Sequence, residues 1–250
     1  YLQEMNERVL SKFDIMTVGE CAGVTIEEAK KYAGFDTDEL GMVFQFEHIC
    51  LDQYSEKWDV KPLPLVELKR CTERWQTGLS GLGWNSLFLN NHDLPRVVSR
   101  MGNDKEFRVE SAKMLAAMLH GLAGTPFIFQ GEEIGMTNIA LPIEEYVDLE
   151  IINLYEERLA KGYAKEDIMA SIHARGRDNA RTMMQWSDEA YAGFKFINKK
   201  MNVNNLEGHY VGLENLQSML SQMGGNYRQV SDSDYFRMEI LFHTIRDAIP

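Results

Sequence analysis

Basic residues, cysteines and long apolar runs are all scarce in this 250-residue sequence. Lysine and arginine number 26 against 38 acidic residues, so the formal net charge is −12. This excess of acid argues against nucleic acid or an anionic membrane surface as the main partner. No apolar run approaches the roughly 20 residues of a membrane-spanning helix. An ordinary apolar content of 44% leaves a soluble globular protein as the expected class.

The three cysteines are odd in number, and no metal-ligand spacing relates Cys21, Cys50 and Cys71. We expect reduced and mostly buried thiols, as in a cytoplasmic protein. The sequence begins at Tyr1, without a methionine and inside a helical pattern. We therefore interpret it as a piece of a longer chain, and this start shows nothing about targeting.

Short apolar runs alternate with amphipathic stretches along the first half of the sequence. Strands are predicted at 15–18, 42–46, 86–89 and 127–129, and helices after the Thr25–Glu28 capping box, at 65–79 and at 106–122. This alternation predicts an α/β fold with a parallel sheet that is covered on both faces. Two further helices, at 143–161 and 164–174, are expected on either side of Gly162.

Each predicted strand is followed by polar residues. The four stretches are Gly19–Glu20, Gln45–His48, Asn90–Asp93 and Gln130–Glu133. The carboxyl ends of parallel strands converge on one edge of a sheet or one mouth of a barrel, where α/β enzymes hold their active sites. The sequence therefore predicts one cavity lined by carboxylates, amides and histidines.

Carboxylates in a cleft suit proton transfer to and from sugar oxygens. Glu20 follows an apolar run and could be held protonated as an acid, while Asp93 stands among His92 and two asparagines that would keep it ionised. Ordinary roles compete with this interpretation. Glu20 could be a loop residue, the His92–Asp93 pair could be structural or metal-linked, and Arg177 and Arg181 could be a solvated pair. Glu132 and Glu133 fit the first turn of a helix.

Four motifs in the same order resemble the α-amylase superfamily, glycoside hydrolase family 13. They are MTVGE at 16–20, NNHDLPR at 90–96, GTPFIFQGEEIGMTN at 124–138 and GRDNARTMMQW at 176–186. They are most similar to its oligo-1,6-glucosidase and glucan 1,6-α-glucosidase branch. Val18 matches the members of that branch that favour α-1,6 links and short α-glucosides.

The resemblance implies a partial (β/α)8 barrel over residues 1–194, with its fifth to eighth strands and their helices. It implies retaining hydrolysis of α-glucosidic bonds in short oligosaccharides without cofactor or metal. Glu20 would be the general acid/base, and Asp93 the carboxylate that holds sugar hydroxyls and stabilises the transition state. His92 would hydrogen-bond the same sugar, and Arg177 would be an active-site arginine.

The sequence departs from the family where the nucleophile is expected. The family's nucleophilic aspartate stands on the fourth strand in a G-F-R-x-D motif, which this sequence does not contain. A retaining mechanism needs two carboxyl groups about 5–5.5 Å apart. We therefore expect a truncated glucosidase that is inactive alone, has exposed apolar edges, and needs the missing N-terminal half of the barrel as its partner. Residues 195–250 match nothing in the family and read as a mostly helical tail, with helices near 213–223 and at 233–248.

Three alternatives stay open at this stage. The substrate of the parent enzyme could be trehalose-6-phosphate, sucrose or an α-1,4 oligosaccharide. The chain could be a non-catalytic relative that binds carbohydrate or serves in assembly, although Glu20 and Asp93 are both present. A His–Asp metal hydrolase is the weakest reading, because His48, His92 and His120 have no ligand-like spacing.

Overall fold

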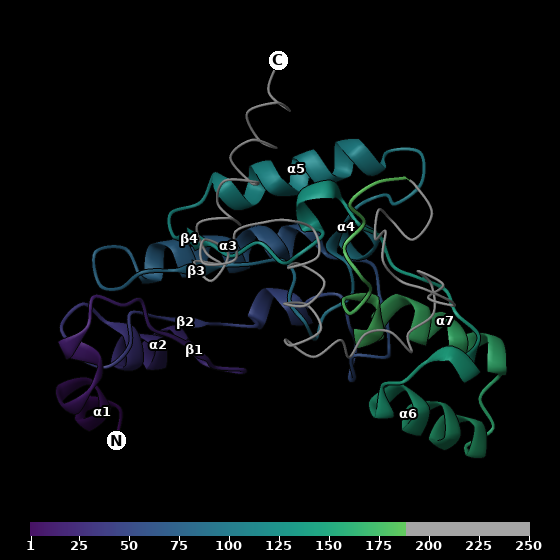
Figure 1. Ribbon diagram of the computed structural model, residues 1–250, viewed down its shortest axis with the longest axis horizontal. Helices are drawn as coiled ribbons and strands as arrows, with labels where there is room; N and C mark the ends of the chain where they lie inside the picture. The colour runs from purple at the N-terminus through teal and green to yellow at the C-terminus, as the bar shows by residue number, and fades with distance from the viewer. Residues whose placement is uncertain (189–250) are drawn as a thin grey trace, which may run out of the picture.

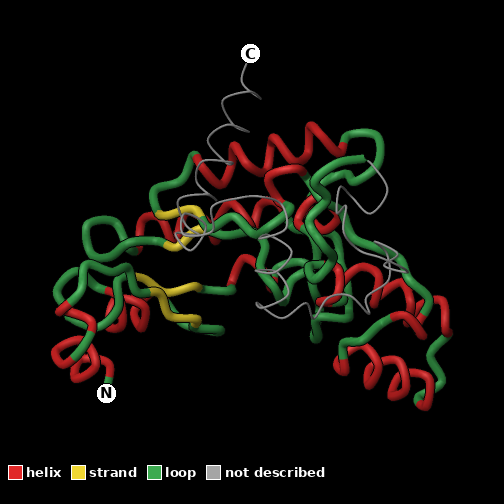
Figure 2. Tube along the Cα trace, viewed as in Figure 1, coloured by secondary structure: helices red, strands yellow, loops and turns green. Residues whose placement is uncertain are grey.

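The computed structural model describes residues 1–188. Its strands are short, and helices and loops make up most of the path (Figure 2). The strands and α-helices are α1 (Leu2–Arg8), β1 (Val18–Glu20), α2 (Ile26–Ala33), β2 (Met42–Phe44), α3 (Leu65–Gly78), β3 (Ser86–Leu87), α4 (Val97–Met101), α5 (Arg108–His120), β4 (Thr125–Pro126), α6 (Leu149–Ala160) and α7 (Lys165–Arg175). Five short 3-10 helices are η1 (Leu10–Lys12), η2 (Glu47–Cys50), η3 (Glu132–Ile134), η4 (Ile143–Glu145) and η5 (Arg177–Asn179).

The strands form two parallel pairs. β1 pairs with β2 so that Gly19 lies opposite Val43, and β3 pairs with β4 so that Ser86 lies opposite Thr125. A helix follows each of the first three strands, as a parallel sheet requires. The predicted parallel βαβ arrangement is therefore confirmed for both pairs.

Side chains join the two pairs between β2 and β3. The Ser86 hydroxyl donates a hydrogen bond of 2.6 Å to the main-chain oxygen of Val43. The ring of Phe88, just after β3, meets those of Phe44 and Phe46 edge-on at 5.1 and 5.3 Å. Contacts thus move from Val43 to Phe46 along one segment as they move from Ser86 to Phe88 along the other, so β2 and β3 run in the same direction. All four strands point their carboxyl ends to one side.

Three apolar clusters stabilise these elements. In the first, Ala29 and Ala33 of α2 pack with Val43 of β2 and with Trp75 of α3. The second joins β3 to α4 and α5. The third joins the α6–α7 hairpin, including Ile151, to Trp58, Leu141 and Tyr146. Figure 1 shows this hairpin at the opposite end of the molecule from α1. Helices α2 and α3 thus pack against β2, and helices α4 and α5 pack against β3.

Several helix boundaries agree with the sequence prediction. The Thr25 hydroxyl accepts from the Glu28 N–H and the Glu28 carboxylate accepts from the Thr25 N–H, so the capping box is present. α3 and α5 lie within the predicted ranges. The α6–α7 break falls at Gly162, which takes a φ of +83°. The predicted helix at 143–161 is interrupted, because Asp148 caps a new helix at Leu149.

The strand predictions at 15–18 and 127–129 were wrong in position. β1 begins only at Val18, and Ile15 and Met16 are exposed. Within the described residues β1 has a neighbour on one side only, so nothing there covers the preceding apolar residues. β4 is Thr125–Pro126, and Phe127 continues the pairing with one hydrogen bond of 2.7 Å to Leu87.

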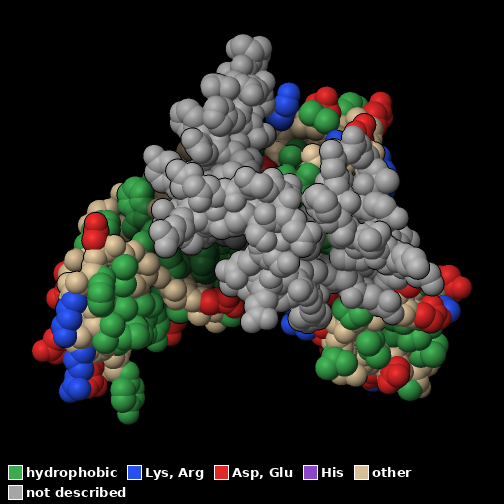
Figure 3. Space-filling view, in the orientation of Figure 1, with side chains coloured by type: hydrophobic (Ala, Val, Ile, Leu, Met, Phe, Trp, Pro, Cys, Tyr) green, Lys and Arg blue, Asp and Glu red, His purple; other side chains and the backbone are tan. Residues whose placement is uncertain are grey.

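Apolar side chains gather over the N-terminal elements on the face shown in Figure 3. The cysteines are free, but only Cys71 is buried, and the expectation of burial was wrong for Cys50, which is exposed. Among residues 1–188 no helix is long and apolar enough to cross a membrane. The helices expected near 213–223 and at 233–248 lie outside the described residues.

Candidate active site

Polar residues follow the strands at the common carboxyl edge. Glu20 ends β1, and its backbone lies in register with Phe44 of β2. The Asn90–Asp93 loop follows β3, and Gln130 and Glu132 follow β4. This order along the edge is the one that the sequence predicts.

Glu20 stands apart from the other expected site residues. Its side chain is exposed, and within residues 1–188 it makes no hydrogen bond or ion pair. The apolar residues before it do not enclose it, because Ile15 and Met16 are themselves exposed. The apolar enclosure that the sequence analysis expected around Glu20 is therefore absent from the described part of the chain.

The loop after β3 is shaped by its asparagines. The Asn91 side-chain oxygen accepts from the Asp93 N–H at 2.8 Å, and the Asn90 side-chain oxygen accepts from the Asn91 N–H at 3.1 Å. Such side-chain turns hold a backbone without regular secondary structure. They place the Asp93 carboxylate 3.3 Å from Nε2 of His92. His92 and Asp93 both remain partly accessible.

Two arginines from the end of the described chain approach Asp93. Nη2 of Arg181 donates to Oδ1 of Asp93 at 3.0 Å, and Arg181 Nε donates to the main-chain oxygen of His92 at 3.3 Å. Nη1 of Arg177 lies 3.6 Å from the same Asp93 oxygen. Asp93 thus has two arginines beside its carboxylate in addition to His92, and the sequence analysis did not expect these arginines as its partners.

A buried aspartate orients Arg177. Asp148 caps α6 and accepts two hydrogen bonds from Arg177, each 2.6 Å long. Burial is the largest single effect on Asp148 and raises its pKa, but the hydrogen bonds from Arg177 and from the Glu150 N–H, together with the charges of Arg177 and Arg181, lower the pKa overall. The hydrogen bonds to Asp148 raise the pKa of Arg177, whose charge is also supported by Glu150 at 3.2 Å.

Asp178 lies completely buried behind this pair. Its Oδ2 accepts from the N–H groups of Val147 and Asp148, each at 3.1 Å. Its Oδ1 has no hydrogen-bond partner, and Arg181 Nη1 is 3.9 Å away. Burial raises the pKa of Asp178. The carboxylate thus fixes the start of α6 against the loop that carries both arginines.

The structure brings together His92, Asp93 and Arg177 but leaves Glu20 separate from them. It corrects the view of Arg177 and Arg181 as a solvated pair, since both form ion pairs with Asp93. Asp148 was missed by the sequence analysis. Its only local signal is the helix-capping position before Leu149, which gives no hint of an arginine partner 29 residues later.

His48 does not belong to the accessible part of this edge. Its Nε2 bonds the main-chain oxygen of Phe88 at 2.8 Å, and its Nδ1 lies 3.0 Å from the Gln45 amide. Burial lowers the pKa of His48 to about 4, so the ring is neutral and can donate to Phe88 and accept from Gln45. The prediction that its side chain lines the cavity is therefore wrong: His48 is a core residue that joins β2 to β3.

The acids after β4 sit in a 3-10 helix, close to the predicted helical first turn. Glu132 accepts from the Phe129 N–H at 3.2 Å and Glu133 from the Gly131 N–H at 2.8 Å. Burial raises the pKa of Glu132 to about 7, and the neighbouring Glu133 adds to this.

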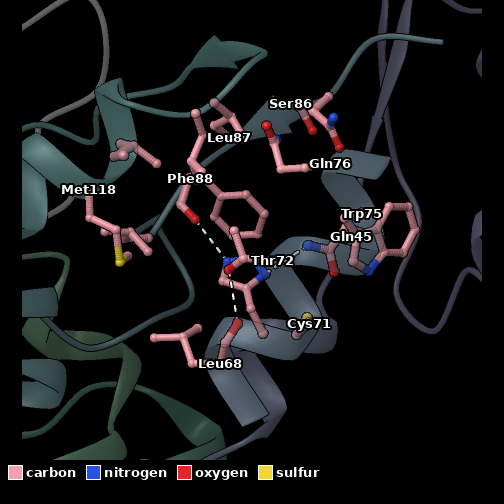
Figure 4. A pocket seen from close by; sticks show the side chains of 15 residues that line it. Gln45, Leu68, Cys71, Thr72, Trp75, Gln76, Ser86, Leu87, Phe88 and Met118 are labelled. Carbon is pink, nitrogen blue, oxygen red and sulfur yellow. Dashed lines mark hydrogen bonds between the residues drawn. The ribbon is translucent and has the colours of Figure 1, made fainter. Parts of the chain in front are cut away.

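The described residues hold no group of three or more histidine, cysteine or acidic side chains placed to bind a metal. A cavity of about 50 Å³ lies between α3, α5 and the β2–β3 strands. Figure 4 shows Leu68, Cys71 and Trp75 of α3 facing Phe88 across it. Gln45 and His48 also line it, but Glu20, His92, Asp93 and Arg177 do not, so it is separate from the candidate site.

Known proteins are similar to this chain in both sequence and structure. Residues 1–231 match the alpha-amylase catalytic domain. The oligo-1,6-glucosidase of Halalkalibacterium halodurans is 60% identical over 196 residues, which cover 78% of this chain and 35% of that protein. The palatinase of Erwinia rhapontici is 52% identical over 193 residues, 75% of this chain and 35% of that protein. The chain thus spans about a third of the length of these curated relatives.

Solved structures agree with the sequence relatives. The trehalose-6-phosphate hydrolase of Bacillus licheniformis superposes with a TM-score of 0.74 at 45% identity, covering 77% of this chain and 35% of that one. An isomaltulose synthase variant of Erwinia rhapontici NX5, solved with its natural substrate sucrose, superposes with a TM-score of 0.72 at 35% identity, covering 78% and 35%. The α/β fold is therefore that of the (β/α)8-barrel glycosidases, and the chain belongs to the α-amylase family.

Proposed function

We propose that this chain supplies the carboxyl-side half of the barrel of a retaining α-glucosidase, in which β1–β4 are the fifth to eighth strands. The observation that carries the proposal is the contact of Arg181 and Arg177 with Asp93, at the carboxyl end of β3. Parallel strands that end at one edge are where a barrel enzyme binds its substrate. The 60% identity to an oligo-1,6-glucosidase supports the reaction class.

In this mechanism Glu20 protonates the leaving glycosidic oxygen and then deprotonates the water that releases the sugar. Asp93, positioned by its contact with Arg181, binds sugar hydroxyls, and His92 hydrogen-bonds the same ring. The nucleophile comes from a part of the catalytic domain that these 250 residues do not contain. That part would also cover β1 and enclose Glu20, which raises its effectiveness as an acid.

The proposed substrates are short α-glucosides with α-1,6 links. Val18, the residue before Gly19–Glu20, matches the branch with this preference, and the relative at 60% identity is named for it. A trehalose-6-phosphate hydrolase is the second candidate, because a structure of that enzyme superposes with a TM-score of 0.74. The two candidate enzymes would use the same mechanism but act on substrates with a different second sugar, so an assay must compare those substrates.

Complementation tests this proposal. The 250-residue chain is produced together with the segment of the Halalkalibacterium halodurans oligo-1,6-glucosidase that precedes its matched region, giving a two-chain enzyme. We expect turnover of an aryl α-glucoside and of isomaltose by the two-chain enzyme and none by either chain alone. Glu20→Gln and Asp93→Asn should each abolish turnover, whereas the exposed Glu27→Gln and Asp14→Asn should not.

Three other results of this experiment would each change the proposal. Turnover by the pure 250-residue chain would overturn the need for an outside nucleophile. A stable, folded two-chain complex without turnover of any α-glucoside would favour a non-catalytic binding or assembly role. Faster turnover of trehalose-6-phosphate than of isomaltose would move the assignment to the second candidate.

A further inference from the structure

Arg96 is a fully buried arginine in the loop that carries Asp93. It stands three residues after Asp93, and none of its surface is exposed. Its side chain donates hydrogen bonds to the main-chain oxygens of Gln130 (2.5 Å), Asn179 (3.0 Å), Ala180 (3.2 Å) and Thr182 (3.4 Å), and to the Thr182 hydroxyl (3.1 Å). These acceptors belong to two segments, the loop after β4 and residues 179–182 from the last residue of η5 onward.

No carboxylate neutralises this charge directly. Within residues 1–188 Arg96 has no ion pair at 4.0 Å or less, and Glu132 and Glu133 act on it only from a longer range. Main-chain oxygens and the face of Phe129, 5.5 Å from the guanidinium carbon, surround it instead. Burial lowers the pKa of Arg96 to about 10, which still leaves it charged at neutral pH. Burying an unpaired charge is costly, so a role in stability alone does not explain it well.

The acceptors of Arg96 enclose one residue of the candidate site. Ala180 and Thr182 are the neighbours of Arg181 on either side, and both of their carbonyls point at the same guanidinium nitrogen. Arg181 in turn reaches Asp93 at 3.0 Å. The backbone that carries Arg181 is therefore fixed on both sides by the loop that carries its partner.

We propose that Arg96 is a positioning residue that holds the 179–182 turn so that Arg181 meets Asp93. Only a guanidinium offers five N–H donors in a flat fork that can span both segments at once. A lysine would keep the charge but could not reach the same set of carbonyls. The link from Arg96 to catalysis rests on the proposed function, whereas the link from Arg96 to Arg181 does not.

The test follows the Arg181 side chain in the 250-residue chain labelled with ¹⁵N-arginine. The Nε–Hε signal of Arg181 is identified by its loss in Arg181→Lys. In Arg96→Lys we expect its exchange with water to become at least about tenfold faster, because hydrogen-bond constraints on the turn are lost. The Nε of Arg100, which donates to Asp52 at 2.9 Å, reports in the same spectrum whether the fold is intact.

Arg108→Lys is the matched control. Arg108 also donates to two main-chain oxygens after β4, those of Ile134 and Gly135, but it does not contact the 179–182 turn. We expect its substitution to leave Arg181 exchange unchanged. Equal acceleration in both variants, or a folded Arg96→Lys chain with wild-type exchange, would overturn the proposal. Loss of the Arg181 and Arg100 signals together in Arg96→Lys would indicate a role in overall stability and would count against it.

A milder variant keeps the test decisive if Arg96→Lys does not fold. Thr182→Val removes the hydroxyl that accepts from Arg96 and donates to the main-chain oxygen of Asn179, while keeping the shape of the side chain. We expect a smaller but measurable acceleration of Arg181 exchange, and no change in a folded Thr182→Val chain would contradict the proposal. In the two-chain enzyme Arg96→Lys should lower kcat more than it changes KM. If Arg181 exchange accelerates in Arg96→Lys but the wild-type two-chain enzyme shows no turnover, the positioning role of Arg96 would stand, and only the proposed function would be contradicted.

Discussion

Arg177 donates two hydrogen bonds of 2.6 Å to Asp148, whose side chain is only 2% exposed. This bidentate geometry uses the Nε and Nη2 sides of the guanidinium and leaves Nη1 at 3.6 Å from Asp93. Arg181 makes the shorter contact with Asp93, at 3.0 Å. The two arginines therefore have different tasks, Arg177 as the partner of a buried acid and Arg181 as the partner of the accessible one.

We predict that Arg177→Gln destabilises the chain by about 2–3 kcal/mol, because it leaves the buried Asp148 charge without its main partner. The expected loss is smaller than the roughly 3–5 kcal/mol of a fully buried pair, since Arg177 is 30% exposed. Urea unfolding at neutral pH measures it. Arg70→Gln is the control, because Arg70 pairs with Glu67 on the exposed face of α3, and its loss should be below about 1 kcal/mol. Equal losses in the two variants would contradict the prediction.

His48 should make stability depend on pH. Its pKa is about 4 in the folded chain and about 6.5 when unfolded. The unfolded chain therefore binds more protons between these values, so the free energy of unfolding rises with pH across this window and is level above it. For this group alone the rise from about pH 5 to about pH 7.5 is about 2 kcal/mol.

The measurement is urea unfolding at both pH values for the wild type, His48→Gln and His120→Gln. We expect the pH difference to shrink by about 2 kcal/mol in His48→Gln. His120 is exposed on α5, so its variant should keep the wild-type difference. A His48→Gln chain with an unchanged pH difference would show that the folded chain tolerates a charged His48.

Local signals allowed most helices to be predicted. Thr25 and Glu28 carry a capping box that needs no distant partner, and Gly162 marks the α6–α7 break by its backbone conformation alone. Strand positions were less predictable. Ile15 and Met16 have the apolar pattern of a buried strand, but burial depends on a neighbour beyond β1, and the described residues supply none.

The candidate site was predictable only in part for the same reason. Asp93 and His92 are adjacent in sequence and follow an apolar strand, so the order of the chain alone places them together. The contacts of Arg181 with Asp93 and of Arg177 with Asp148 join residues 88 and 29 positions apart. No periodicity in the sequence encodes such pairs. The motif resemblance pointed to Arg177, whereas the geometry gives the shorter contact to Arg181.

Gly131→Ala should destabilise the loop between β4 and η3. Gly131 has a φ of +93°, and an added Cβ would lie 2.8 Å from Nη1 of Arg96 and press against Met136. We expect a loss of about 3 kcal/mol, which combines backbone strain with overpacking. Gly162→Ala is the control, because its φ is +83° and a Cβ there meets nothing within 4 Å. Strain alone should cost it about 1–2 kcal/mol, and thermal unfolding of both variants compares them.

Kinetics of the two-chain enzyme should separate the two arginines. Arg181→Lys removes a donor that lies 3.0 Å from the Asp93 carboxylate, and losing one such group in an active site lowers kcat by about 100-fold. Arg177→Lys keeps a charge near Asp148 and disturbs Asp93 only through the longer contact, so we expect about a tenfold loss, together with a lower unfolding temperature. The exposed Arg70→Lys should leave both quantities unchanged. The opposite order, with Arg177→Lys the more damaging to kcat, would mean that substrate binding turns Arg177 away from Asp148 and toward the sugar.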